Sequence, residues 1–358
     1  MCVATCAAWL TATTCQAGIV AATGDSQTSA YGAILQYQFN RFGLPAQALR
    51  FASGGASAPI YTGQATDIHA DPPHAHDFGA DALNSGAGVV LFQLGVNDSF
   101  LEPDQFAAFQ TLIGAEFDAF QTAGAQVIVG ANLPVLTNPN DARYALADER
   151  VRTLYNPWLQ TQAAERGWLF LDNYHAIQQQ PGWQSWYSDD GLTPGYVHLY
   201  GGQKVNGITP GYDWLSQQYA FGVASLCAGD ADMNGVVDGA DYTAWADGFH
   251  QLGGFAGGDF NCDLLIDGAD YTIWADNFSP GSAAIPVPEP ASWLLLVVGS
   301  WLPVITFGSS CAAAPRQYAK NCSPQLGKLG SKAAGQKTTS GAAETGNFCA
   351  RSRRAAQG

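Results

Sequence analysis

The sequence predicts an α/β fold for residues 18 to about 225, in which a parallel sheet lies between helices on both faces. Short apolar runs at residues 18–23, 88–94, 126–130 and 168–171 are continuous rather than alternating, which is typical of strands buried on both sides. Helical periodicity fills the segments between them, as in the stripe formed by Phe106, Phe109, Ile113, Phe117 and Phe120. A segment of this length buries one sizeable core, and its functional groups belong at the carboxyl ends of the strands.

The segment Gly-Asp-Ser-Gln-Thr at residues 24–28 follows the first apolar run. The next helix is predicted from the spacing of Tyr31, Ile34, Leu35, Phe39 and Phe42, and it ends at Gly43. Ser26 therefore lies at a strand-to-helix junction, and its backbone N–H is in a position to stabilise an oxyanion. We interpret Ser26 as a nucleophile, and an ordinary helix cap is the alternative.

Two further segments with glycine and polar side chains also follow predicted strands. Residues 51–57 read Phe-Ala-Ser-Gly-Gly-Ala-Ser, and residues 95–98 read Gly-Val-Asn-Asp. Together with the segment around Ser26, they resemble three blocks of the SGNH or GDSL hydrolase family. The resemblance implies a flavodoxin-like three-layer α/β/α fold with a parallel sheet. It also implies an oxyanion hole formed by the N–H groups of Ser26 and Gly55 and the side chain of Asn97.

The family's fourth block, Asp-x-x-His, is altered in this chain. Residues 190–194 read Asp-Gly-Leu-Thr-Pro, with Thr193 where the histidine is expected. We favour an insertion between acid and base, with His198 as the general base and Asp190, or its neighbour Asp189, as the orienting carboxylate, because threonine cannot accept a proton near neutral pH. A Ser-His dyad oriented by a backbone carbonyl is the rival, and His175 is a weaker alternative base.

Residues 67–77 are dense in side chains that bind metals. They contain Asp67, His69, Asp71, His74, His76 and Asp77. This composition suits zinc, but the Pro-Pro pair and the lack of helical histidine spacing leave the geometry unspecified. We therefore interpret the segment as a loop near the site, and we expect catalysis to need no cofactor.

An internal repeat follows the α/β segment. Residues 229–247 return as residues 258–276, 29 positions later, with a shared Asp-Tyr-Thr-x-Trp start to a predicted helix. Oxygen-bearing side chains occupy loop positions 1, 3, 5, 9 and 12 of each copy, as a hard cation such as Ca²⁺ requires. The predicted ligands are Asp230, Asp232, Asn234, Asp238 and Asp241, then Asp259, Asn261, Asp263, Asp267 and Asp270, with the backbone carbonyls of Val236 and Leu265 at position 7.

This repeat resembles a dockerin, a small all-α, EF-hand-like calcium module, and the resemblance implies a cohesin-like protein partner. Position 6 is Gly235 in the first loop but Leu264 in the second, where the sharp turn normally requires glycine. We expect weaker binding in the second loop. Because the clustered carboxylates repel one another without metal, we expect the module to fold with calcium.

The sequence divides into five predicted regions. Residues 1–17 read as a secretory signal peptide, either complete or truncated, residues 18–226 as the hydrolase domain and residues 227–280 as the calcium module. Residues 281–310 contain Val-Pro-Glu-Pro before an apolar run and resemble a PEP-CTERM sorting signal, which implies membrane anchoring. Residues 311–358 read as a basic disordered tail.

Charge divides at the same place as these regions. Residues 1–280 hold 7 Lys and Arg against 28 Asp and Glu, and the remainder holds 8 against 2. The acidic body argues against nucleic acid as a partner. Cys227 and Cys262 flank the repeat loops and could pair in an oxidising compartment.

The sequence as a whole favours a secreted or surface-anchored bacterial serine esterase. By analogy with enzymes that carry dockerins, we expect it to remove O-acetyl or similar groups from extracellular polysaccharide. The alternative is a catalytically impaired hydrolase fold that acts as a calcium-dependent surface adhesion or scaffold protein.

Overall fold

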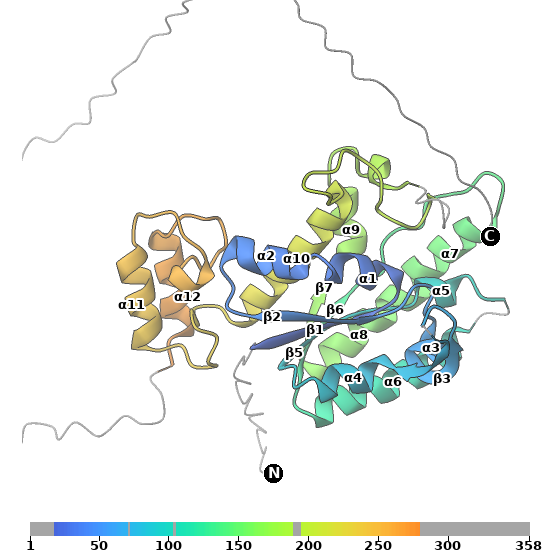
Figure 1. The fold of residues 1–358 in the computed structure, drawn as a ribbon, viewed down its shortest axis with the longest axis horizontal. Helices are drawn as coiled ribbons and strands as arrows, with labels where there is room; N and C mark the ends of the chain where they lie inside the picture. The colour runs from blue at the N-terminus through green and yellow to red at the C-terminus, as the bar shows by residue number, and fades with distance from the viewer. Residues whose placement is uncertain (1–17, 71, 103–104, 189–194, 280–358) are drawn as a thin grey trace, which may run out of the picture. The chain divides into compact units, whose positions relative to one another are not determined.

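The computed structural model describes residues 18–70, 72–102, 105–188 and 195–279. Its centre is a parallel sheet of strand order β2-β1-β5-β6-β7 between two helix layers (Figure 1). The strands are β1 (Ile19–Gly24), β2 (Gln47–Ala52), β5 (Val89–Gln93), β6 (Gln126–Gly130) and β7 (Leu169–Leu171). The predicted parallel strands are thus confirmed to within one or two residues, together with a parallel sheet covered on both faces.

Helices connect and cover these strands. They are α1 (Ser26–Gly32), α2 (Leu35–Phe42), α3 (Ala58–Tyr61), α4 (Phe78–Asn84), α5 (Val96–Ser99), α6 (Phe106–Thr122), α7 (Arg143–Arg150), α8 (Asn156–Arg166), α9 (Asn173–Gln178) and α10 (Pro210–Leu226). A π-helical turn, η1 (Val151–Tyr155), joins α7 to α8, and a 3₁₀ turn, η2 (Trp183–Trp186), follows α9.

The two faces of the sheet bury separate apolar layers. Val20, Val89 and Ile128 pack with residues of α1, α2 and α10 on one face. Val90 and Val127 face the other way and pack with α6 and α8. Because side chains alternate along a strand, both faces need apolar residues, which explains the uninterrupted apolar runs in the sequence.

The helix predicted from Ser26 to Phe42 is two helices. The first ends at Gly32, and the second begins at Leu35 after a turn at Ala33 and Ile34. Glycine is a poor helix former, and Gly32 is where the regular pattern stops. The predicted end at Gly43 is confirmed, because this residue caps α2 with a φ of 66°.

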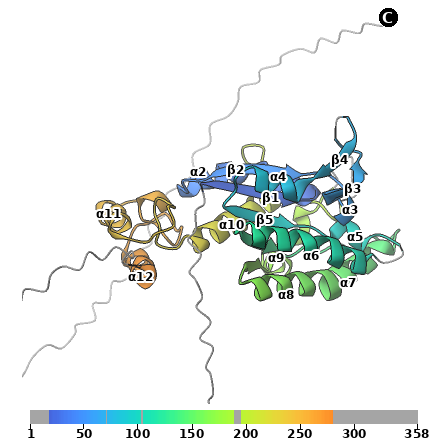
Figure 2. The ribbon, with the colours of Figure 1, turned by 90° about the horizontal axis from the view of Figure 1, so that it is seen from below.

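The histidine-rich segment also differs from the prediction. Residues 68–70 and 72–73 form the predicted loop, but β3 (Thr62–Asp67) and β4 (His74–Asp77) on either side of it form an antiparallel pair beside α3 (Figure 2). Backbone pairing with the preceding residues of β3 accounts for this strand, and the composition of the segment gave no sign of it.

The repeat region folds as two similar loop–helix units. Helices α11 (Gly239–Gly248) and α12 (Gly268–Asn277) start at the same position of each copy, with a 3₁₀ turn, η3 (Phe255–Gly257), between them. Asp238 caps α11 and Asp267 caps α12, and each is part of a capping box with the aspartate three residues later. The helix start predicted from the repeat is confirmed in both copies.

The predicted pairing of Cys227 with Cys262 is wrong. Cys262 is a free, buried thiol, whereas Cys227 takes part in a different disulfide. Because the sulfur of Cys227 is already bonded, it cannot pair with Cys262.

The predicted signal peptide (residues 1–17), sorting segment (281–310) and basic tail (311–358) lie outside the described residues. Within the described part of the chain, no helix is long and apolar enough to span a membrane.

Candidate active site

Three loops that carry predicted site residues leave neighbouring strands at one edge of the sheet. β1 lies between β2 and β5, and these strands lead to Ser26, Gly55 and Asn97 respectively. At the end of β1, Gly24 has a φ of 153°, and a Cβ there would collide with the carbonyl oxygen of Gln93 on β5. Glycine is therefore required before the serine so that the two strands can approach each other.

Ser26 and His198 are in direct contact. Nε2 of His198 lies 2.8 Å from Oγ of Ser26, although 172 residues separate them in the sequence. The hydroxyl donates to Nε2 when the neutral imidazole carries its proton on Nδ1. His198 is only 6 % exposed, so its ring is held in a largely desolvated position. The pair has the geometry of a nucleophile and its general base.

Gln27, next to Ser26, reaches the segment that carries His198. Its side chain is 2 % exposed, and Nε2 donates to the carbonyl oxygen of Val197 over 2.9 Å. One hydrogen bond thus links the residue after the serine to the residue before the histidine. Gln27 was missed from the sequence, because its role is visible only once Val197 is known to be close.

The predicted oxyanion donors lie in loops that are tied together. Nδ2 of Asn97 donates to the carbonyl oxygen of Ala56 over 2.9 Å, so this side chain lies against the loop that contains Gly55. Among the described residues, the backbone N–H groups of Ser26 and Gly55 donate to no other atom. Nδ2 carries a second proton, so three donors remain for a substrate oxygen.

Two carboxyl groups are buried below this edge. Asp25 caps α1 by accepting from the N–H of Gln27, and Asp98 accepts from the N–H of Ala58 over 2.9 Å. Burial raises the pKa of Asp25 to about 7, and the nearby Asp98 adds to this shift. Burial also raises the pKa of Asp98 to about 7. Both groups hold backbone N–H groups of the loops that surround Ser26.

The other predicted acid and base candidates have different positions. Asp189 and Asp190 lie outside the described residues. His175 is exposed, and its Nδ1 lies 2.8 Å from Oδ2 of Asp172 at the start of α9. It therefore makes a local hydrogen bond in place of the contact that a base for Ser26 requires.

The β3–β4 hairpin has no cluster of metal-binding groups among its described residues. Nε2 of His76 lies 2.6 Å from Asp81, and Nδ1 of His74 lies 2.7 Å from the carbonyl oxygen of Pro72. These side chains are engaged with different partners and do not converge on a shared position.

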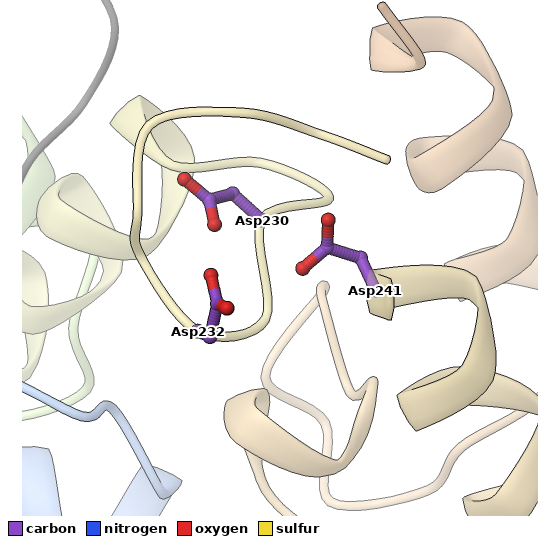
Figure 3. A group of neighbouring side chains, drawn as sticks. All are labelled: Asp230, Asp232 and Asp241. Atoms are coloured by element: carbon purple, nitrogen blue, oxygen red, sulfur yellow. The ribbon is translucent and has the colours of Figure 1, made fainter. Parts of the chain in front are cut away.

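The first repeat loop does bring carboxylates together. Oxygen atoms of Asp230, Asp232 and Asp241 lie within 4.8 Å of one another, and Figure 3 shows the three groups pointing toward a common space. In the second loop, Asp259 accepts from the N–H groups of residues 263 and 264 just as Asp230 accepts from those of residues 234 and 235. The residue types and spacing of both loops fit a calcium ion.

The fold and the Ser26–His198 geometry together define a class, the three-layer α/β proteins with a serine–histidine pair at the carboxyl ends of the strands. Within it, the chain belongs to the GDSL-like lipase/acylhydrolase family, whose family model matches residues 19–200. No curated protein matches the chain.

Several solved structures are similar to this fold. A lipase/acylhydrolase from Enterococcus faecalis has 16 % sequence identity and a TM-score of 0.41, over 56 % of this chain and 92 % of that one. A GDSL-like lipase from Bacteroides thetaiotaomicron has 15 % identity and a TM-score of 0.41, over 58 % and 88 %. A catalytic mutant of Axe2, an acetylxylan esterase from Geobacillus stearothermophilus, has 12 % identity and a TM-score of 0.41, over 57 % and 94 %.

Proposed function

We propose that this acylhydrolase is a secreted or surface-anchored serine esterase that removes O-acetyl groups from extracellular polysaccharide. The observation that carries the catalytic part is the 2.8 Å contact between Ser26 Oγ and His198 Nε2 beside three amide donors. The polysaccharide substrate is supported by the dockerin-like repeat, and the location by the predicted signal peptide and sorting segment.

In the proposed mechanism, Ser26 Oγ attacks the ester carbonyl carbon while its proton passes to His198 Nε2. The N–H groups of Ser26 and Gly55 and the amide of Asn97 stabilise the oxyanion. The C–O bond to the sugar then breaks, and the leaving oxygen takes the proton from His198. Water then gives a proton to the same imidazole and attacks the acyl carbon, the bond from that carbon to Ser26 Oγ breaks, Oγ takes the proton back from His198, and acetate leaves. Asp190 is the proposed carboxylate that orients His198.

Hydrolysis of p-nitrophenyl acetate by the full chain tests this mechanism. We expect Ser26→Ala and His198→Ala each to lower kcat at least about a thousand-fold. Asn97→Ala removes one oxyanion donor and should lower kcat by about a hundred-fold or more. Ser29→Ala changes a serine one turn further along α1 and serves as the matched control. Equal rates for the Ser26 variant and the unaltered chain would reject the mechanism.

The repeat region is proposed to bind one calcium ion in each loop. The three facing carboxylates of the first loop support this proposal, and the second loop has the same hydrogen-bonding register at position 1. When bound, the ion would neutralise the clustered charge and hold each loop against its helix. The folded module is then available to a cohesin-like partner.

Calorimetric titration of the full chain with calcium, after treatment with a chelator, tests the second proposal. We expect two sites, of which Asp230→Asn weakens one and Asp259→Asn the other. Asp247→Asn, outside both predicted ligand sets, is the control. The calcium proposal would be contradicted if the chain bound no calcium and its near-ultraviolet circular dichroism spectrum did not change when the ion was added.

The alternative, an adhesion or scaffold protein, differs in one measurable respect. It predicts calcium-dependent binding of a partner together with ester hydrolysis that Ser26→Ala does not change. The contact between Ser26 and His198 favours the enzyme.

A further inference from the structure

The loop that follows His198 has a defined shape. At its base, Oγ1 of Thr209 donates to the carbonyl oxygen of Leu199 over 2.7 Å. Near its tip, Val205 and Ile208 exchange backbone hydrogen bonds of 2.9 and 3.0 Å around Asn206-Gly207. Both turn residues have positive φ, 52° and 81°, as the tight Asn-Gly hairpin turn requires. The loop is therefore preformed.

Two hollows lie between this loop and the helices α1, α2 and α10. The smaller, of about 130 Å³, is lined by Ala30, Ile34, Tyr200, Lys204 and Tyr212. The larger, of about 390 Å³, is lined by Tyr37, Arg41, Gln203, Val205 and Asp213. Ile208 lines both, so the two hollows adjoin. The larger volume falls in the range of about 300–1,000 Å³ that is usual for ligand pockets.

One residue of the smaller hollow, Tyr200, lies beside the reacting pair. The ring centroids of His198 and Tyr200 are 5.7 Å apart, and those of Tyr200 and Tyr212 are 5.1 Å apart. Tyr200 thus places one wall of the smaller hollow beside the imidazole. Ala30, on another wall, lies one turn along α1 from Ser26. A chain-like ligand bound at Ser26 would reach the smaller hollow first and the larger one next.

The lining combines apolar faces with groups that bind hydroxyls. Tyr37 is 44 % exposed and Val205 70 % exposed, so both apolar surfaces are accessible. Lys204, the only lysine in residues 1–280, lines the smaller hollow, and Arg41 lines the larger one 3.8 Å from Asp213. Sugar rings present C–H faces that pack on aromatic rings and hydroxyls that bond to charged and amide side chains. This mixture suits a glycan better than a lipid chain.

We propose that the two hollows form a groove for an oligosaccharide, which holds neighbouring sugars while the ester of one sugar reaches Ser26. The groove rests on the proposed function, since it supplies the polymeric part of that substrate. Pyranose hydroxyls are the shared chemistry, and both neutral and uronic acid chains offer them. Carboxylates of a uronic acid chain would in addition pair with Lys204, whereas Arg41 already lies 3.8 Å from Asp213.

Calorimetry with full-length Ser26→Ala tests the groove without turnover. The probes are acetylated xylo-oligosaccharides and acetylated oligogalacturonates, each from disaccharide to hexasaccharide. We expect the tetrasaccharide to bind about ten-fold more tightly than the disaccharide, because only the longer chain reaches the larger hollow. Added Tyr37→Ala should remove this gain, and added Lys204→Ala should weaken all lengths.

Exposed residues elsewhere serve as matched controls. Tyr242, on α11, is 41 % exposed, nearly the same as Tyr37, so Tyr242→Ala should leave the length dependence intact. Arg143→Ala removes an exposed cation that lines neither hollow and should not affect oligosaccharide binding. Affinity independent of chain length, or a Tyr242 variant as weak as the Tyr37 variant, would overturn the proposal, as would the failure of both glycan series to bind.

These results separate the groove from the enzyme. If Ser26→Ala binds longer glycans more tightly but the unaltered chain does not hydrolyse p-nitrophenyl acetate, the groove is supported and the esterase mechanism is rejected. If the unaltered chain hydrolyses this ester but Ser26→Ala binds all glycan lengths equally, the esterase mechanism is supported and the groove is rejected. Tighter binding of oligogalacturonates than of xylo-oligosaccharides identifies uronic acid chains as the ligand, and the reverse order identifies neutral ones.

Discussion

Gln27 provides a test of how the chain holds its histidine in place. The substitution Gln27→Met keeps the length and volume of the side chain but removes the donor to Val197, whose carbonyl oxygen then loses its partner. A partly buried acceptor left without a hydrogen bond costs about 1–3 kcal/mol. If the same free energy is lost from the positioning of the imidazole in the transition state, kcat falls about 5- to 150-fold.

The assay is steady-state hydrolysis of p-nitrophenyl acetate across a pH range. We expect kcat to fall while KM stays unchanged, because Gln27 acts on the histidine segment and not on the bound ester. The acidic limb of the pH profile should not move, since a carbonyl partner does not alter the charge around the imidazole. Burst amplitude would show that the fraction of active protein is the same.

Gln38 offers a matched control. It is fully buried, and its Nε2 donates to Oδ1 of Asp213 over 2.8 Å and to Oγ of Ser216 over 3.0 Å, remote from Val197. Gln38→Met should lower the free energy of unfolding but not kcat for the small ester. An unchanged kcat in the Gln27 variant, or an equal fall in both variants, would refute the reasoning.

Three further predictions follow from burial and backbone geometry. Because the pKa of Asp25 is raised from 3.8 to about 7, the folded protein keeps a proton there that the unfolded chain has lost, so stability falls as the pH rises between these values. Urea unfolding of Asp25→Asn should lack up to roughly 4 kcal/mol of this pH dependence, and parallel curves for the two proteins would contradict it. Leu264 has a φ of 74°, so Leu264→Gly should stabilise the second repeat loop by about 1 kcal/mol and tighten the calcium binding proposed for it, as measured by calorimetry, whereas weaker binding would contradict this prediction. Phe117 is fully buried, and its ring is 4.9 Å from Phe92 and 6.0 Å from Trp158, so Phe117→Ala should cost about 3–5 kcal/mol in urea unfolding. The exposed Phe249→Ala is the control, and equal losses would show that burial is not the cause.

Much of the site could be predicted because its parts are local patterns. Gly24, Ser26 and Asn97 are placed by strand ends, and a strand end is marked by where an apolar run stops. The pairing of Ser26 with His198 was predicted only through the family resemblance, since nothing in the sequence relates two residues that are 172 positions apart. The hairpin at residues 62–77 was missed because its residues are mostly polar and show no hydrophobic strand pattern, whereas backbone pairing stabilises both strands.

The sequence by itself determined the position along the chain of the buried parallel strands, the position of the serine and the register of both repeat loops, because hydrophobic period, glycine placement and loop spacing act over short distances. Only the tertiary structure decided that Val197 lies within reach of Gln27, that His198 reaches Ser26, and that the loop from 199 to 209 walls two adjoining hollows. These contacts depend on strand order and on how the connecting loops are closed. Sequences with the same local patterns can differ both in the order of the strands within the sheet and in the path of the connecting loops.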